Sequence, residues 1–218
     1  MKLFQKKIKK AVVCIHGFGL RGPKEFDNLV LPLEKEGYKL FIPKLFDLNN
    51  PNDIEWANWI FKAEKVINDI QNEFDEIIII GFSMGGIIAS YLANKAKVSK
   101  VILLACAYDY MNVDNVIDYI FSRNKKTSIP QPFKDAFRNL VDNTKSSVER
   151  IKVPCLLLHC DHDEVINISS SYKLMKKIPT EDKMLITFSN GQHRLLDDPI
   201  CKGAAINNII YFVKKGHE

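Results

Sequence analysis

The sequence predicts an α/β protein in which a mostly parallel sheet carries helices on both faces. Short apolar runs alternate along the chain with longer segments whose apolar residues recur every three or four positions. The four isoleucines at residues 77–80 are apolar on both faces, as expected for an inner strand of a parallel sheet. Strands that alternate with helices form such sheets, with helices packed on either side.

Strands are predicted where short runs of β-branched and other apolar residues are bounded by glycine, proline or polar residues. They lie at residues 11–15, 39–42, 77–80, 100–105, 154–159 and 184–188. Pro43 directly follows the second run and ends it, because proline has no N–H for a sheet hydrogen bond.

Helices are predicted from apolar stripes of helical period at residues 24–36, 53–74, 87–96, 169–178 and 200–214. The stripe is clearest in the second of these segments, where Trp56, Trp59, Ala63, Ile67 and Ile70 share one face. Gly37 follows the first segment, in the position of a C-terminal cap.

Residues 106–152 interrupt the alternation of strand and helix. Apolar stripes run through residues 113–121 and 133–141, and the turn at residues 129–132 contains two prolines. We interpret the two stripes as helices of a small inserted cap, since long insertions in α/β folds are usually functional. The alternative is a pair of ordinary helices that cover the sheet.

Composition limits the class of protein. A chain of 218 residues that is 46% hydrophobic and 26% charged predicts one globular domain spanning residues 1–218. The net charge of +5 comes without a nucleic-acid-binding motif, so no nucleic-acid partner is expected. No run is long enough to span a membrane, so no stable membrane insertion is expected. The five cysteines form no C-x-x-C, which suits buried thiols in the cytoplasm.

The motif G-x-S-x-G at residues 81–85 lies between the predicted central strand and a helix. A serine on so tight a turn has a strained backbone, and Gly81 and Gly85 leave room for it. The following helix directs its free N–H groups toward Ser83, so the N–H of Met84 is placed to bind a developing oxyanion. The alternative is a glycine-rich turn with an ordinary surface serine.

A reactive serine needs a base, and the base needs an orienting acid. His193 follows the last predicted strand, and Asp161 and Asp163 follow the strand before it. Asp109, just past an earlier strand, is a more distant candidate acid. Groups at the carboxyl ends of parallel strands meet at one edge of the sheet. Residues 159–163 do not predict a metal site, because neighbours on a strand or tight loop point in different directions.

Four motifs together resemble α/β-hydrolase-fold serine hydrolases of the small carboxylesterase and monoacylglycerol-lipase-like kind. They are HGFG at 16–19, GFSMGG at 81–86, HCDHDEV at 159–165 and GQH at 191–193. The resemblance covers nearly the whole chain. It implies Ser83 as nucleophile, Asp163 as acid and His193 as base, an oxyanion hole formed by the N–H groups of Phe18 and Met84, and no cofactor. His16 is expected to shape the turn that places Phe18.

The expected activity is hydrolysis of a small apolar carboxylic ester of short to medium acyl length. Phe18, Phe82 and Met84 lie near the turn and suggest an apolar pocket. Two alternatives stay open: an acyl-thioesterase, and a non-catalytic protein of the same fold that binds a small ligand. The sequence does not predict the oligomeric state.

Overall fold

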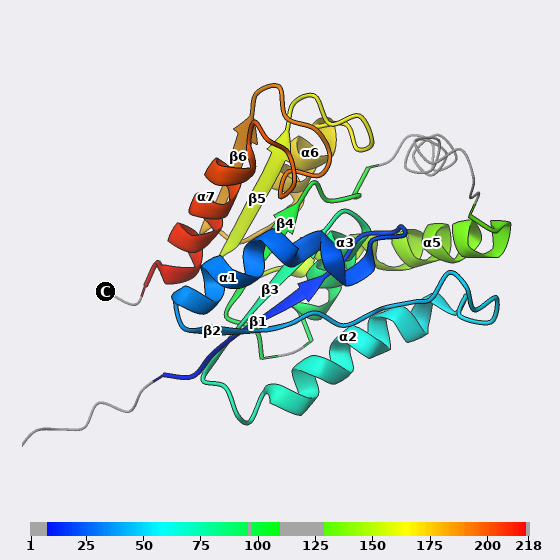
Figure 1. Cartoon of the computed structure of the whole chain (residues 1–218), viewed down its shortest axis with the longest axis horizontal. Helices are drawn as coiled ribbons and strands as arrows, with labels where there is room; N and C mark the ends of the chain where they lie inside the picture. The colour runs from blue at the N-terminus through cyan, green and yellow to red at the C-terminus, as the bar shows by residue number, and fades with distance from the viewer. Residues whose placement is uncertain (1–7, 96, 110–128, 217–218) are drawn as a thin grey trace, which may run out of the picture.

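One six-stranded parallel sheet forms the centre of the protein (Figure 1). The computed structural model describes residues 8–95, 97–109 and 129–216. The strands are β1 (Lys10–Ile15), β2 (Tyr38–Phe41), β3 (Glu76–Phe82), β4 (Lys100–Leu104), β5 (Cys155–Cys160) and β6 (Lys183–Phe188). Their order across the sheet is β2-β1-β3-β4-β5-β6, so β3 lies near the middle.

The side chains of β3 alternate between two hydrophobic cores, one on each face of the sheet. Ile77 and Ile79 belong to one core, and Ile78 and Ile80 to the other. A strand buried on both faces needs apolar residues at successive positions, which explains the unbroken isoleucine run. The predicted fold class, a mostly parallel sheet covered on both faces, is therefore confirmed.

The helices divide between these two cores. Apolar residues of α1 (Asp27–Lys35) and α7 (Lys202–Lys214) pack in one core (Figure 1). Those of α2 (Trp56–Ile70), α3 (Met84–Leu92), α5 (Gln131–Thr144) and α6 (Ser169–Lys177) pack in the other. Two 3-10 helices, Gly22–Phe26 and Lys145–Arg150, precede α1 and follow α5.

The largest differences from the predicted helix boundaries are in three segments. The segment predicted at 24–36 begins as the 3-10 helix Gly22–Phe26, with proline in its first turn. The helix predicted at 53–74 is confined to Trp56–Ile70, and Asp53 lies in the loop before it, where its carboxylate accepts hydrogen bonds from the Asp47 N–H and from Lys62. The helix predicted at 87–96 begins earlier, at Met84. Its first turn contains two glycines, whose low helix propensity kept this turn out of the prediction.

The segment predicted as a cap is described only in part. Its second helix is α5, which contacts α2 and α3 and buries Phe133, Phe137 and Leu140 among them. Its first helix, predicted at 113–121, lies outside the described residues. The assignment of residues 106–152 as an inserted cap stays a prediction.

Two further expectations concern cysteines and membranes. All five cysteines are buried and free, as predicted. In the ranges that the structure describes, no helix has both the length and the apolar character needed to cross a membrane.

Candidate active site

Ser83 occupies a strained turn between β3 and α3. Its φ and ψ are 53° and −118°, a conformation that a residue with a side chain rarely adopts. Three backbone hydrogen bonds hold this conformation. The Ser83 N–H donates to the Leu104 carbonyl at 2.8 Å, and the Ser83 carbonyl accepts from the N–H groups of Gly86 at 2.9 Å and Ala107 at 3.2 Å. The turn is thus anchored to the end of the adjacent strand β4 as well as to its own helix.

The two motif glycines are required by close backbone approach. A Cβ atom at Gly81 would lie 2.3 Å from the Gly85 carbonyl oxygen. A Cβ atom at Gly85 would lie 2.0 Å from the Ile15 carbonyl oxygen at the end of β1. Because both obstacles are backbone atoms, no side-chain rotation relieves the clash. The G-x-S-x-G spacing therefore has a direct steric cause in this protein.

The loop after β1 brings the HGFG motif beside Ser83. A Cβ at Gly17 would lie 3.1 Å from the Ser83 Cβ. Within the described ranges, the Phe18 N–H has no hydrogen-bond acceptor. The Met84 N–H lies in the first turn of α3, where helical N–H groups have no intrahelical partner. Both candidate oxyanion-hole donors are therefore near Ser83 and open to an acceptor.

His16 shapes this loop, as expected from the sequence. It is fully buried, and its Nε2 accepts a hydrogen bond from the Leu45 N–H at 3.0 Å. Nδ1 therefore carries the ring proton and donates to the Gly17 carbonyl at 2.8 Å. Burial lowers the pKa of His16 to about 4, assisted by the charge of Lys44. At neutral pH, His16 is therefore an uncharged side chain that holds the loop through two hydrogen bonds.

His193 and Asp163 form a buried hydrogen-bonded pair. Nδ1 of His193 lies 2.8 Å from Oδ2 of Asp163, and their side chains are 5% and 0% exposed. Because a carboxylate accepts, Nδ1 carries the proton, which leaves Nε2 as a free base. Burial alone would raise the pKa of Asp163, but His193 and His159 hold it well below its usual range. Asp163 is therefore a carboxylate throughout the physiological pH range.

The other two candidate acids have different partners. Asp161 is hydrogen-bonded to His162 at 2.7 Å and to the Asn190 N–H at 2.7 Å. Asp109 forms an ion pair with Lys173. Of the three acids considered from the sequence, Asp163 is the one hydrogen-bonded to His193.

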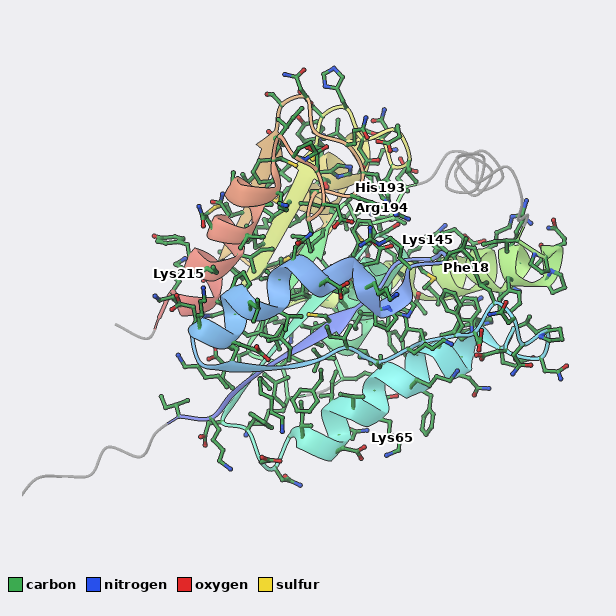
Figure 2. All side chains as sticks on the ribbon, in the orientation of Figure 1. Phe18, Lys65, Lys145, His193, Arg194 and Lys215 are labelled. Carbon is green, nitrogen blue, oxygen red and sulfur yellow. The ribbon has the colours of Figure 1, made fainter. Side chains whose placement is uncertain are left out.

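Ser83 and His193 line the same cavity, which has a volume of about 290 Å³. Figure 2 labels His193, Arg194 and Phe18 together at this part of the molecule, away from Lys65 and Lys215. Phe82 lies against His193, with ring centroids 4.9 Å apart. Phe18 and Phe82 line the cavity as expected, whereas the Met84 side chain is fully buried in the core.

Charged side chains make up much of the cavity wall. The sequence patterns did not predict these charged residues as part of the site. One lies within the HCDHDEV motif and the others follow the HGFG and GQH motifs: Glu164, and Arg21, Glu25, Arg194, Asp197 and Asp198. Arg21 pairs with Asp197 at 2.7 Å, and Arg194 lies 3.7 Å from Glu25. Burial raises the pKa of Glu25, against the lowering effect of Arg194. Closeness to the motifs was the one signal in the sequence that could have identified them.

Glu164 was also missed, although it follows Asp163 directly. Its Oε2 accepts a hydrogen bond from the His193 N–H at 3.0 Å. The loop that carries the acid therefore holds both the side chain and the backbone of His193. In the described part of the chain, no group of three or more histidine, cysteine and acidic side chains is arranged to hold a metal ion.

This sheet order, the turn at Ser83 and the histidine after the last strand define an α/β-hydrolase fold. A family model described as serine aminopeptidase, S33 matches residues 123–200. The chain is similar to a thermostable monoacylglycerol lipase of Bacillus sp. (strain H-257), at 22% identity over 205 residues, which cover 84% of this chain and 82% of the relative.

Solved structures share the fold across nearly the whole chain. One comes from a study of the metagenome-derived lipolytic enzymes LipS and LipT, with a TM-score of 0.80, 16% identity, and coverage of 95% of this chain and 94% of the other. Another is a monoacylglycerol lipase of Paleococcus ferrophilus, with a TM-score of 0.69, 17% identity and coverage of 98% of both chains. The fold expected from the motifs is confirmed: the chain shares the α/β-hydrolase fold with these proteins.

Proposed function

We propose that the protein is a serine hydrolase that cleaves carboxylic esters through Ser83, His193 and Asp163. The observation that carries this proposal is one shared cavity. Its wall includes Ser83, which lies on a strained strand-to-helix turn, and His193, whose Nδ1 is hydrogen-bonded to the buried carboxylate of Asp163. These are the nucleophile, base and orienting acid that acyl transfer requires.

The reaction proceeds in two halves. His193 Nε2 takes the proton of the Ser83 hydroxyl as Oγ attacks the ester carbonyl. The tetrahedral intermediate collapses, the C–O bond to the alcohol breaks, and His193 returns the proton to the leaving oxygen. Water then attacks the acyl-enzyme by the same steps and releases the carboxylic acid and free Ser83. No cofactor enters this scheme.

Two backbone donors stabilise the negative charge of each tetrahedral intermediate, and one carboxylate stabilises the positive charge that develops on His193. The Phe18 and Met84 N–H groups bind the oxyanion, and two such donors contribute several kcal/mol in the transition state. Asp163 stabilises the imidazolium that His193 becomes. Phe18 is held in place by ring contacts with Phe46 at 5.4 Å and with Phe137 of α5 at 5.2 Å.

The cavity supports a small substrate. Its volume of about 290 Å³ is at the lower end for ligand pockets, and its wall combines two aromatic rings with six charged side chains. Such a wall favours short acyl groups, because a long alkyl chain would have to displace water from the charged groups. We expect turnover of p-nitrophenyl acetate and butyrate to exceed that of the palmitate ester.

The test is hydrolysis of a p-nitrophenyl acyl series by the native protein and by Ser83→Ala. The variant should lose activity by a factor of about 10³ or more and keep its circular dichroism spectrum and melting temperature. Parallel assays with acyl-thioesters separate an esterase from a thioesterase. Unchanged turnover in Ser83→Ala would refute the assignment of the nucleophile.

A further inference from the structure

The Asp163 carboxylate accepts three hydrogen bonds and lies close to the ring of a second histidine. Oδ1 accepts from the backbone N–H groups of Val165 and Ile166, each at 2.8 Å. Oδ2 lies 2.8 Å from His193 Nδ1 and 3.1 Å from His159 Nε2. The three hydrogen bonds and the nearby His159 ring surround the carboxylate on both of its oxygens.

His159 is held in one orientation by its other contacts. Its side chain, on β5, is 0% exposed. Nε2 lies 2.9 Å from the Ile166 carbonyl oxygen as well as near Asp163, and both neighbours are acceptors. Nε2 must therefore carry a proton. Nδ1 lies 2.7 Å from the hydroxyl oxygen of Ser171 on α6, which fixes the far side of the ring.

We propose that His159 is a positioning residue for the catalytic acid, holding Asp163 Oδ2 in the place where it accepts the His193 proton. This inference rests on the proposed function, because it assigns His159 a role in the same hydrolytic site. Two protonated imidazole nitrogens converge on one buried oxygen, so rotation of the carboxylate away from His193 would also break its close contact with His159.

The physical benefit is a fixed and ionised acid. A buried carboxylate that loses a hydrogen-bond donor becomes easier to protonate and freer to rotate. Either change weakens the support for the His193 imidazolium, which forms only during the reaction. Loss of His159 should therefore lower kcat and leave KM nearly unchanged, because His159 does not line the cavity.

The first test needs no variant and no substrate. Histidine side-chain ¹⁵N NMR of the native protein reports which ring nitrogen carries the proton. The proposal requires a protonated Nε2 on His159 and a protonated Nδ1 on His193, whose proton resonates far downfield in a bond to a carboxylate. An unprotonated Nε2 on His159 would overturn it, whatever the activity of the protein.

The second test compares His159→Gln with His159→Leu. The glutamine amide can place an N–H near the Nε2 position, whereas leucine removes the donor. We expect His159→Leu to lose the downfield His193 proton signal and about 10- to 100-fold in kcat. His159→Gln should keep the signal and most of kcat. A leucine variant with unchanged signal and kcat, or a glutamine variant as impaired as leucine, would overturn the proposal.

Tyr38→Phe is the matched control for general loss of stability. Its hydroxyl donates a buried hydrogen bond to the Val213 carbonyl at 2.8 Å, on the other face of the sheet. This variant should lower stability and leave the His193 signal intact. If the native protein cleaves no ester, the proposed function fails, whereas the NMR measurements still decide the role of His159.

Discussion

At the scale of single residues, the histidines show how burial and partners divide one side-chain type among several roles. His193 lies beside the cavity with one nitrogen bonded to Asp163. His16 and His159 are fully buried and hydrogen-bonded through both ring nitrogens. His162 is largely exposed and pairs with Asp161. Of these four, His193 is the one that can exchange protons with a ligand in the cavity.

The buried neutral state of His16 predicts a pH dependence of stability. Its pKa is about 4 in the folded protein and about 6.5 when unfolded, so the unfolded chain binds more protons between these values. The free energy of unfolding should therefore be highest above pH 6.5 and fall as the pH drops toward 4. At about 1.4 kcal/mol per pKa unit, His16 alone contributes roughly 3 kcal/mol to this fall.

Urea denaturation at pH 7.0 and pH 4.5 measures this contribution. In His16→Gln, which can accept the Leu45 N–H without titrating, the difference between the two pH values should shrink. His162→Gln, at an exposed position, is the control and should leave the difference unchanged. An equal pH dependence in native protein and His16→Gln would show that His16 does not contribute.

At the scale of elements, the strand-turn-helix unit of β3 and α3 depends on backbone contacts that a sequence pattern can only suggest. The glycines at 81 and 85 predict a tight turn, and the structure supplies the obstacles, which are carbonyl groups of Gly85 and Ile15. The first residues of α3 were missed because Gly85 and Gly86 are poor helix formers. They lie in the helix because α3 packs directly against β1 and β3.

Two alanine substitutions at helical glycines test this steric argument. Gly85→Ala should destabilise the protein by about 2 kcal/mol or more and impair the turn at Ser83, since its Cβ would meet the Ile15 carbonyl at 2.0 Å. Gly203→Ala, in α7, meets no atom within 4 Å and should stabilise by about 0.5 to 1 kcal/mol. Thermal unfolding of both variants measures the contrast, and equal melting temperatures would contradict it.

At the scale of the whole molecule, topology determines how much of the site could be predicted. The six strands were predictable to within one or two residues, because β-branched apolar runs between polar boundaries have few other interpretations. The order of nucleophile, acid and base along the chain was also readable. The choice of Asp163 over Asp109 and Asp161 came only from the resemblance of its motif, because the physical choice depends on side-chain directions in loops.

The charged cavity wall was unpredictable for the same reason. Arg21 and Asp197 are far apart in the sequence. They meet because the carboxyl ends of the parallel strands β1 and β6 point to the same end of the sheet. The apolar pocket expected from Phe18 and Phe82 is therefore only part of the cavity. Pairings between loops arise from the fold, and no local pattern encodes them.

Lys100 lies at the other end of the sheet, where the strands begin, and links β4 to the end of α7. Its Nζ donates to the carbonyl groups of Val213 and Lys215 at 2.7 Å each and to that of Phe212 at 3.3 Å. It also lies 3.7 Å from the Glu76 carboxylate. We expect Lys100→Met to lower the free energy of unfolding by about 2 to 3 kcal/mol, because the last carbonyls of α7 lose a charged donor.

Lys214→Met is the control for that substitution. Lys214 is half exposed and pairs with Glu36 at 2.8 Å, and exposed ion pairs contribute about 0 to 1 kcal/mol. Chemical denaturation should therefore separate the two variants by more than about 1 kcal/mol. A Lys100 variant as stable as the Lys214 variant would contradict the role assigned to this contact.

The most direct measurement of the central claim is labelling by a fluorophosphonate, which reacts with a serine only when a base activates it. Mass spectrometry of the digested protein should find one phosphonyl adduct, on Ser83, and the adduct should be absent from His193→Ala. A native protein that stays unlabelled at Ser83, or a His193→Ala variant that labels as fast as the native protein, would contradict a Ser83–His193 nucleophilic site.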